Sequence, residues 1–186
     1  MCGIIGAVAQ RNVVPILIEG LRRLEYRGYD SAGLVVVNDE LHCVRSTGRV
    51  ESLARLVREQ DAQGMLGIAY TRWATHGVPA ERNAPPHLSD DAFAVVHNGI
   101  IENHESLRRQ LEKAGYEFLS DTDTEVIVHL VHLYYRESND LLAAVQACIA
   151  LLKGAYAMAV VCRHEPARMV CVRLGNPLLI GQCIED

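Results

Sequence analysis

The chain has few of the features that mark secreted, membrane-bound or nucleic-acid-binding proteins. Its longest apolar runs, such as residues 155–162, are far shorter than the ~20 residues that a membrane-spanning helix needs. No basic region followed by an apolar stretch and a cleavage site opens the sequence, so secretion is not indicated. A net charge of −5 gives no basic footprint for nucleic acid. We therefore expect a cytoplasmic protein with neither a membrane nor a nucleic acid as partner.

The sequence also lacks the common motifs for disulfides, nucleotides and metals. Its six cysteines form no C-x-x-C pair and mostly stand beside Val, Ile or Ala, as reduced core thiols do. Neither glycine-rich phosphate-binding motif occurs. His129 and His132 stand three residues apart without a third ligand pattern, and residues 121–125 lack the glycine and spacing of a calcium loop. We expect no metal and no cofactor.

What the sequence does contain suits one globular domain. Of its 186 residues, 49% are hydrophobic and 22% are charged, which is ordinary for a protein with a sizeable core. Helical spacing of apolar residues predicts helices from Asn12 to about Gly28, over 49–59, over 103–114, from about Asp123 onward and over 139–153. Strands are predicted over 4–8, 34–38, 41–46, 65–71, 92–97, 155–162, 168–173 and 178–180.

The order of these elements indicates a fold class. Strands come in adjacent pairs and helices in adjacent pairs, rather than in strict alternation. That order favours an α+β arrangement in which largely antiparallel sheets pack between helices. Residues 77–88, with three prolines, are expected to form an irregular loop. Thr122 and Glu125 have the spacing of a capping box at a helix start.

The second residue can combine a nucleophile with its own base. If Met1 is removed, Cys2 carries both a thiol and a free α-amine. The amine has a pKa of about 7.7–8.0 and the thiol one of about 8.5, so the amine can accept the thiol proton near neutral pH. Such a residue needs no separate histidine. If Met1 stays, an amide replaces the amine and the base is lost. On position alone, a small apolar residue at the start of a strand remains the alternative.

Three further segments carry candidate site residues, each with a structural alternative. Arg72 follows a strand and can bind a carboxylate through two hydrogen bonds, or can be a structural arginine beside a core tryptophan. Asn98-Gly99 is the strongest short signal for a hairpin turn, although the same pair can donate a side-chain amide and a backbone N–H to an oxyanion. The acidic segment 121–125 is either a helix start or a partner for a ligand ammonium.

Taken together, five blocks of sequence resemble one family. They are CGIIG at residues 2–6, YRGYDSAG at 26–33, TRWATHG at 71–77, HNGIIEN at 97–103 and SDTDTEV at 120–126. Their order and spacing closely resemble the N-terminal glutaminase domain of the glutamine–fructose-6-phosphate aminotransferases, from Cys2 to about Ile180. The resemblance implies an N-terminal-nucleophile hydrolase fold, a four-layer αββα sandwich.

The resemblance also implies roles at the matching positions. Cys2 is the nucleophile and its amine the base, while Asn98 and the Gly99 N–H form the oxyanion hole. Arg72 holds the α-carboxylate of glutamine and Asp123 its α-ammonium. The resemblance implies that the site is lined by Trp73, Thr75 and His76. It also implies that Arg27 steadies the N-terminus.

The implied reaction is hydrolysis of L-glutamine to glutamate and ammonia through a cysteinyl thioester. In the family, the ammonia passes to a C-terminal isomerase domain that binds fructose 6-phosphate and forms glucosamine 6-phosphate. We expect residues 1–186 to be the glutaminase domain in a shortened form, without the isomerase domain. The resemblance also allows a homodimer.

Two other functions stay open at this point. One is a glutaminase domain that serves another acceptor, as in the amidotransferase of purine synthesis or in asparagine synthetase. These share the CGI start, although the YRGYDSAG and TRWATHG blocks fit them less well. The other is a non-catalytic fragment that binds glutamine without turnover because Met1 is retained.

Overall fold

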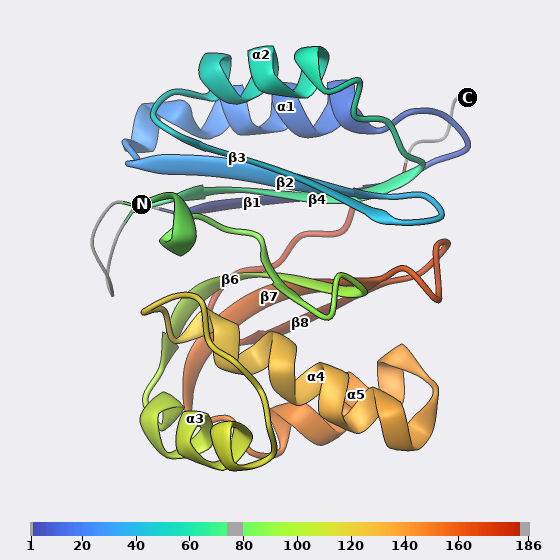
Figure 1. Ribbon diagram of the computed structural model, residues 1–186. Helices are drawn as coiled ribbons and strands as arrows, with labels where there is room; N and C mark the ends of the chain where they lie inside the picture. The colour runs from blue at the N-terminus through green and yellow to red at the C-terminus, as the bar shows by residue number, and fades with distance from the viewer. Residues whose placement is uncertain (1, 74–79, 183–186) are drawn as a thin grey trace.

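Two antiparallel sheets stack face to face between two layers of helices in the computed structural model, which describes residues 2–73 and 80–182 (Figure 1). The first sheet has the order β1-β4-β2-β3. Its strands are β1 (Gly3–Val8), β2 (Ser31–Val37), β3 (Leu41–Thr47) and β4 (Leu66–Arg72). Helices α1 (Val14–Leu24) and α2 (Val50–Glu59) cover its outer face, and a short 3-10 helix, η1 (Glu25–Arg27), extends α1.

The second sheet has the order β5-β6-β7-β8 and carries three helices on its outer side. Its strands are β5 (His87–Ser89), β6 (Phe93–Ile101), β7 (Gly154–Cys162) and β8 (Met169–Leu174). The helices are α3 (His104–Lys113), α4 (Thr124–Ser138) and α5 (Leu141–Ile149). A second 3-10 helix, η2 (Glu81–Asn83), precedes β5. The α+β class and the four-layer αββα sandwich are confirmed (Figure 1).

Strand β2 shows why the sequence folds into layers. All seven of its residues are buried, because both faces of the strand are covered. Leu34 and Val36 pack with α1 and α2, whereas Val35 and Val37 face the second sheet. Successive side chains of a strand point to opposite faces, so one continuous apolar run fills two cores at once.

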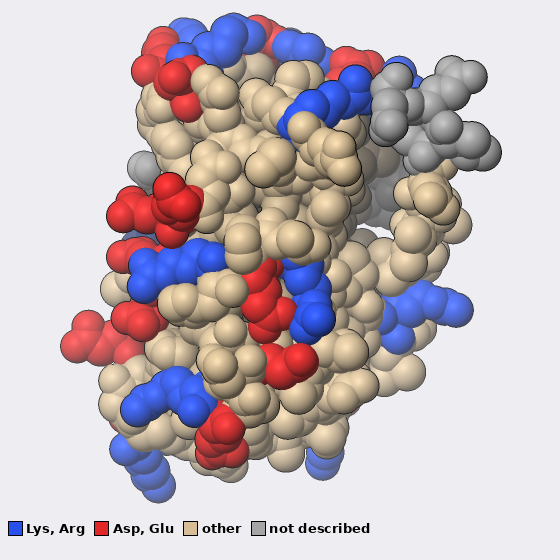
Figure 2. Space-filling model, turned by 90° about the vertical axis from the view of Figure 1, so that its right-hand side faces the viewer, with Lys and Arg blue, Asp and Glu red and all other residues tan. Residues whose placement is uncertain are grey.

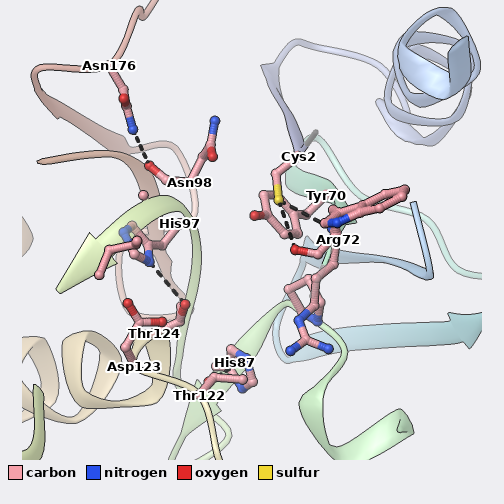
Figure 3. Close-up of a pocket in the computed structure, with 14 residues that line it drawn as sticks. Cys2, Tyr70, Arg72, His87, His97, Asn98, Thr122, Asp123, Thr124 and Asn176 are labelled. Atoms are coloured by element: carbon pink, nitrogen blue, oxygen red, sulfur yellow. Dashed lines mark hydrogen bonds between the residues drawn. The ribbon is translucent and has the colours of Figure 1, made fainter. Parts of the chain in front are cut away.

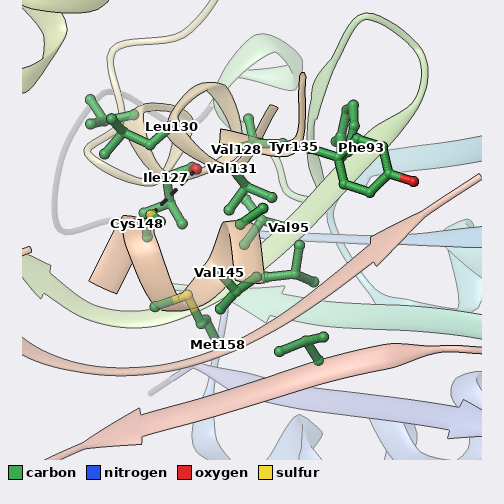
Figure 4. Packing of buried hydrophobic residues seen from close by; sticks show 14 of the residues in the cluster. Phe93, Val95, Ile127, Val128, Leu130, Val131, Tyr135, Val145, Cys148 and Met158 are labelled. Carbon is green, nitrogen blue, oxygen red and sulfur yellow. Dashed lines mark hydrogen bonds between the residues drawn. The ribbon is translucent and has the colours of Figure 1, made fainter. Parts of the chain in front are cut away.

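The third core lies between the second sheet and its helices. Phe93, Val95 and Met158 of the sheet pack there against Val131 of α4 and Val145 of α5 (Figure 4). Burial of one such side chain is worth about 1.5–3 kcal/mol, so these contacts fix α4 on the sheet. The placement of α4 matters for function because its first turn enters the candidate site.

Charged side chains lie mostly on the outside of the sandwich. Arg22 of α1 and Glu51 of α2 form an ion pair of 2.8 Å, and Arg58 approaches the same carboxylate at 3.4 Å. Figure 2 shows charges of both signs interspersed on one face of the molecule. In the part of the chain that the structure describes, no helix is long and apolar enough to cross a membrane.

The hairpin turn, one of the two alternatives for Asn98-Gly99, does not form. Strand β6 continues through both residues, which pair with Ala157 and Tyr156 of β7. Tertiary pairing overrides the local turn signal here. Gly99 has a φ of +145°, and a Cβ added to it would lie 2.0 Å from the Ala155 carbonyl oxygen. The glycine is therefore required for close approach to β7 and not for a turn.

Four other predicted details are also wrong. The capping box does not form: Thr122 bonds to His87, and Glu125 accepts the N–H groups of residues 119 and 120. The segment predicted as one helix over 139–153 begins only after Asp140 caps Ala143 and ends at Ile149. Residues 178–180 form no strand. Residues 77–79 of the predicted loop lie outside the described residues, and the remainder, 80–88, contains η2 and the first two residues of β5.

Candidate active site

A cavity of about 250 Å³ opens at the end of the sandwich where β1 begins and β4 and β6 end. Its walls come from six stretches of the chain that are separated in sequence (Figure 3). The lining residues are Cys2, Tyr70, Arg72, Trp73, Pro85, His87, His97, Asn98, Gly99, Ile100, Thr122, Asp123, Thr124 and Asn176. The antiparallel pairing of β1 with β4 explains part of this convergence, since it sets the first residues of one strand beside the last residues of the other.

Cys2 lies directly before β1 and is held against the end of β4. Its Sγ accepts a hydrogen bond from the Trp73 N–H at 3.3 Å and lies 3.6 Å from the Trp73 carbonyl oxygen. The pKa of Tyr70, which lines the same cavity, is raised well above its ordinary value, first by burial and then by the neighbouring Cys2.

Arg72 brings a buried cation into the cavity. It is the last residue of β4 and is only 5% exposed. Its Nη1 lies 3.8 Å from Oδ1 of Asp30, and the Asp30 N–H donates to the Arg72 carbonyl at 2.8 Å. A buried charge is costly unless a partner of opposite sign is near, and the planar guanidinium suits a carboxylate. The arrangement can therefore hold an anionic group of a ligand.

Asn98 lies across the cavity from Cys2, and Gly99 lines the same cavity (Figure 3). The Asn98 side chain points toward the Cys2 side of the cavity (Figure 3). The Asn98 main-chain carbonyl accepts a hydrogen bond of 2.8 Å from the side chain of Asn176. A side-chain amide and a backbone N–H close together can stabilise negative charge on an oxygen atom.

Asp123 supplies the opposite charge at the start of α4. It is 4% exposed, and its Oδ2 accepts the Ile101 N–H at 2.8 Å. This bond joins the first turn of α4 to β6. The positive end of the helix dipole also favours a carboxylate at this position. A carboxylate has about four acceptor positions, so Asp123 can bind a ligand ammonium while it keeps the bond to Ile101.

Two buried histidines lie behind these groups. The Nδ1 of His97 is 3.0 Å from the Thr124 hydroxyl, and the Nε2 of His87 is 3.1 Å from the Thr122 hydroxyl. Burial lowers the pKa of His87 to about 3, so this imidazole is neutral at physiological pH. The two bonds fix the threonines on either side of Asp123. They position this segment beside the cavity.

The structure brings Cys2, Arg72, Trp73, Asn98, Gly99 and Asp123 of the predicted site residues together around one cavity. The Trp73 side chain is 54% exposed, and a Cβ added at Gly28 would lie 3.0 Å from its ring. Thr75 and His76 lie outside the described residues, as does the side chain of Arg27, whose backbone ends η1.

Sequence reasoning missed several residues of the cavity. His97, Thr122 and Thr124 adjoin predicted site residues and could have been found by inspecting the same blocks. Tyr70, His87 and Asn176 give no such local signal, because only the tertiary fold brings them to the cavity. Among the residues that the structure describes, no group of three or more His, Cys, Asp or Glu side chains could hold a metal ion.

Comparison with known proteins gives concordant matches. A family model described as a glutamine amidotransferase domain matches residues 71–180. The glutamine–fructose-6-phosphate aminotransferase (isomerizing) of Shewanella oneidensis is 59% identical over 182 residues, and that of Bordetella pertussis is 57% identical over 188 residues. Each comparison covers 97% of this chain, which spans about 30% of the length of these relatives.

Solved structures resemble the chain at lower sequence identity. The glutamine phosphoribosylpyrophosphate amidotransferase from B. subtilis has a TM-score of 0.72 at 26% identity, covering 88% of this chain and 35% of its own. A structure described as the allosteric regulatory enzyme of purine biosynthesis has a TM-score of 0.69 at 29% identity, covering 87% of this chain and 35% of its own.

Proposed function

The chain belongs to the glutamine amidotransferase domain family, and from this membership and the geometry of the cavity we propose that it hydrolyses the side-chain amide of L-glutamine. The observation that carries the proposal is the content of one small cavity. It contains a thiol, a cationic side chain and an anionic side chain, from Cys2, Arg72 and Asp123. At about 250 Å³ it is smaller than most sites for drug-sized ligands, which suits a single amino acid.

The two charged residues account for recognition of the amino-acid head group. Arg72 binds the α-carboxylate, and Asp123 binds the α-ammonium. Arg72 ends β4 of the first sheet, whereas Asp123 precedes α4, which packs on the second sheet. Glutamine bound between them therefore lies across the cavity, with its side chain directed toward Cys2 and Asn98. Binding of the head group then positions the amide carbon next to the thiol.

The reaction proceeds by acyl transfer to sulfur. With Met1 removed, the α-amine of Cys2 takes the thiol proton, and the thiolate attacks the amide carbon of glutamine. The carbonyl oxygen becomes an oxyanion that accepts hydrogen bonds from the Asn98 side chain and the Gly99 N–H. The protonated amine returns its proton to the leaving nitrogen, ammonia departs, and a γ-glutamyl thioester remains.

Water completes the cycle. The neutral α-amine accepts a proton from the water, which attacks the thioester carbon, and the oxyanion forms again in the same place. Collapse of this intermediate expels the Cys2 thiolate, which regains a proton, and glutamate leaves. One glutamine and one water thus give one glutamate and one ammonia.

We further propose that residues 1–186 fold as one glutaminase domain and that the ammonia serves synthesis of glucosamine 6-phosphate. The relatives at 57–59% identity are named for glutamine and fructose 6-phosphate, and this supports the sugar as acceptor. The solved structures named for phosphoribosylpyrophosphate and purine synthesis are only 26–29% identical. They therefore give weaker support to an acceptor from purine synthesis. Transfer would require an isomerase domain like the one inferred for those relatives.

The test is an assay of glutamate and ammonia formed from L-glutamine. Removal of Met1 is first checked by intact mass. The processed chain is expected to release the two products in equal amounts, and Cys2→Ala is expected to abolish release. Cys43→Ala, which removes a half-buried thiol on β3, is the matched control and should retain activity. Equal hydrolysis by the wild type and Cys2→Ala would refute the proposal.

A further inference from the structure

Asn176 reaches the site from a segment that no sequence block had marked. Gly175, with a φ of +83°, turns the chain after β8 and forms an isolated bridge with Tyr156 of β7. The turn brings Asn176 beside Asn98, 78 residues earlier in the chain, where its amide donates to the Asn98 carbonyl at 2.8 Å (Figure 3). Because a carbonyl can only accept, the atom of Asn176 that faces it is the NH₂ group.

This bond restrains one peptide unit of β6. In a trans peptide the C=O and the following N–H point in opposite directions. The carbonyl of Asn98 and the N–H of Gly99 belong to the same unit, so Asn176 orients both. Restraint matters here because a glycine lacks the Cβ that limits backbone rotation, and Gly99 has an unusual φ of +145°.

The restrained N–H lies at the edge of β6 that adjoins the cavity. Two residues further on, the Ile101 N–H donates to Asp123, a cavity residue. N–H groups two residues apart in a strand point to the same edge. Strand β5 covers this edge only as far as Val95, and no other strand among the described residues pairs with it beyond that point. The Gly99 N–H is therefore placed for a ligand and not for a neighbouring strand.

We propose that Asn176 is a positioning residue for the oxyanion hole: it holds the peptide between Asn98 and Gly99 so that the Gly99 N–H faces the carbonyl oxygen of glutamine. This inference rests on the proposed glutaminase function. Asn176 itself touches no reacting atom. It acts through the peptide plane, and its effect appears where negative charge develops on oxygen.

The test compares Asn176→Ala and Asn176→Asp with the wild-type chain. Alanine removes the donor, whereas aspartate keeps the shape but points an acceptor at the Asn98 carbonyl, so it should be the slower of the two. We expect kcat for glutamine to fall about 3- to 30-fold in Asn176→Ala, less than the ~10²–10³-fold that follows outright loss of an oxyanion donor. KM should change little. Gln182→Ala removes an exposed amide from the same segment and serves as control.

Two probes separate positioning from a merely structural role. Glutamate γ-semialdehyde forms a hemithioacetal with Cys2 and places an oxyanion in the hole, so its affinity should fall by the same factor as kcat. Iodoacetamide alkylates Cys2 without forming an oxyanion, so its rate should not change. Equal loss of alkylation and hydrolysis would indicate a disturbed site and overturn the inference. Unchanged kcat and unchanged affinity for the semialdehyde would overturn it as well.

Failure of the proposed function has a different signature. A processed wild-type chain that does not hydrolyse glutamine would refute the function, whatever Asn176 does. The inference is then decided by a crystal structure of Asn176→Ala. A peptide between residues 98 and 99 that turns away from its wild-type orientation supports the positioning role, and an unchanged peptide overturns it.

Discussion

Replacing Asp123 by asparagine separates the charge of this residue from its structural bond. The side chain is 4% exposed and accepts the Ile101 N–H at 2.8 Å. Asparagine has nearly the same shape, and its carbonyl oxygen can still accept that N–H. The substitution therefore removes the negative charge that we assign to binding the α-ammonium and leaves the link between α4 and β6 in place.

The expected loss follows from the kind of bond removed. A hydrogen bond to a charged group contributes about 1.5–3 kcal/mol, so KM for glutamine and Kd for glutamate should rise about 10- to 150-fold. The free energy of unfolding should change little. Asp123→Ala should show the same loss of binding and in addition lose about 1–3 kcal/mol of stability, because the Ile101 N–H is left buried without an acceptor.

Steady-state kinetics, calorimetric binding of L-glutamate and urea unfolding together measure these effects. A ligand control isolates the ammonium: the glutamine analogue with hydrogen in place of the α-amino group should bind equally to the wild type and Asp123→Asn. Unchanged glutamate binding in Asp123→Asn would refute the assigned contact. Equal loss of binding for both ligands would show that the substitution disturbs the cavity in some other way.

Two further predictions concern stability. Gly99→Ala should unfold at a lower urea concentration than Gly115→Ala. Both glycines have positive φ, but only the Cβ at Gly99 would lie 2.0 Å from a backbone oxygen. Equal unfolding midpoints for the two variants would contradict the close approach of Gly99 to β7. For Glu125, burial raises the pKa, but the nearby His129 imidazole, 3.7 Å away, and hydrogen bonds from Ser120 and backbone N–H groups outweigh burial and lower the pKa from 4.5 to about 2. The stability from this carboxylate is therefore fully present above pH ~5 and is lost as the pH falls toward 2, so the wild type should lose more stability over this range than Glu125→Gln. Equal losses of stability in the wild type and Glu125→Gln as the pH falls, measured by urea unfolding, would contradict this prediction.

The layered fold could be predicted from the sequence because the spacing of apolar residues indicates which faces of helices and strands are buried. The run at residues 34–37 and the helical spacing from Val14 to Leu24 both became core elements. Element boundaries failed where a distant partner decided the outcome. The pairing of Asn98 and Gly99 with β7 replaced a predicted turn, and the contacts of Thr122 and Glu125 replaced a predicted cap.

The site was predictable to the extent that its residues stand in recognisable blocks. Cys2, Arg72, Asn98 and Asp123 were predicted and line one cavity. His87 and Asn176 were not predicted, because each contributes through a bond to a distant residue. His87 bonds to Thr122, 35 positions away, and Asn176 bonds to Asn98, 78 positions away. Such contacts depend on the packing of α4 against the second sheet and on a turn after β8, and no local pattern encodes them.

The central claim is that Cys2, with its own α-amine as base, is the nucleophile in an assembled glutamine site. It is tested most directly by intact mass before and after exposure to a glutamine-like electrophile, such as a diazoketone analogue. We predict a chain that lacks Met1, gains one adduct and loses that adduct on Cys2→Ala, while excess L-glutamate slows its formation. A processed chain that gains no adduct, or an adduct that persists in Cys2→Ala, would contradict the account.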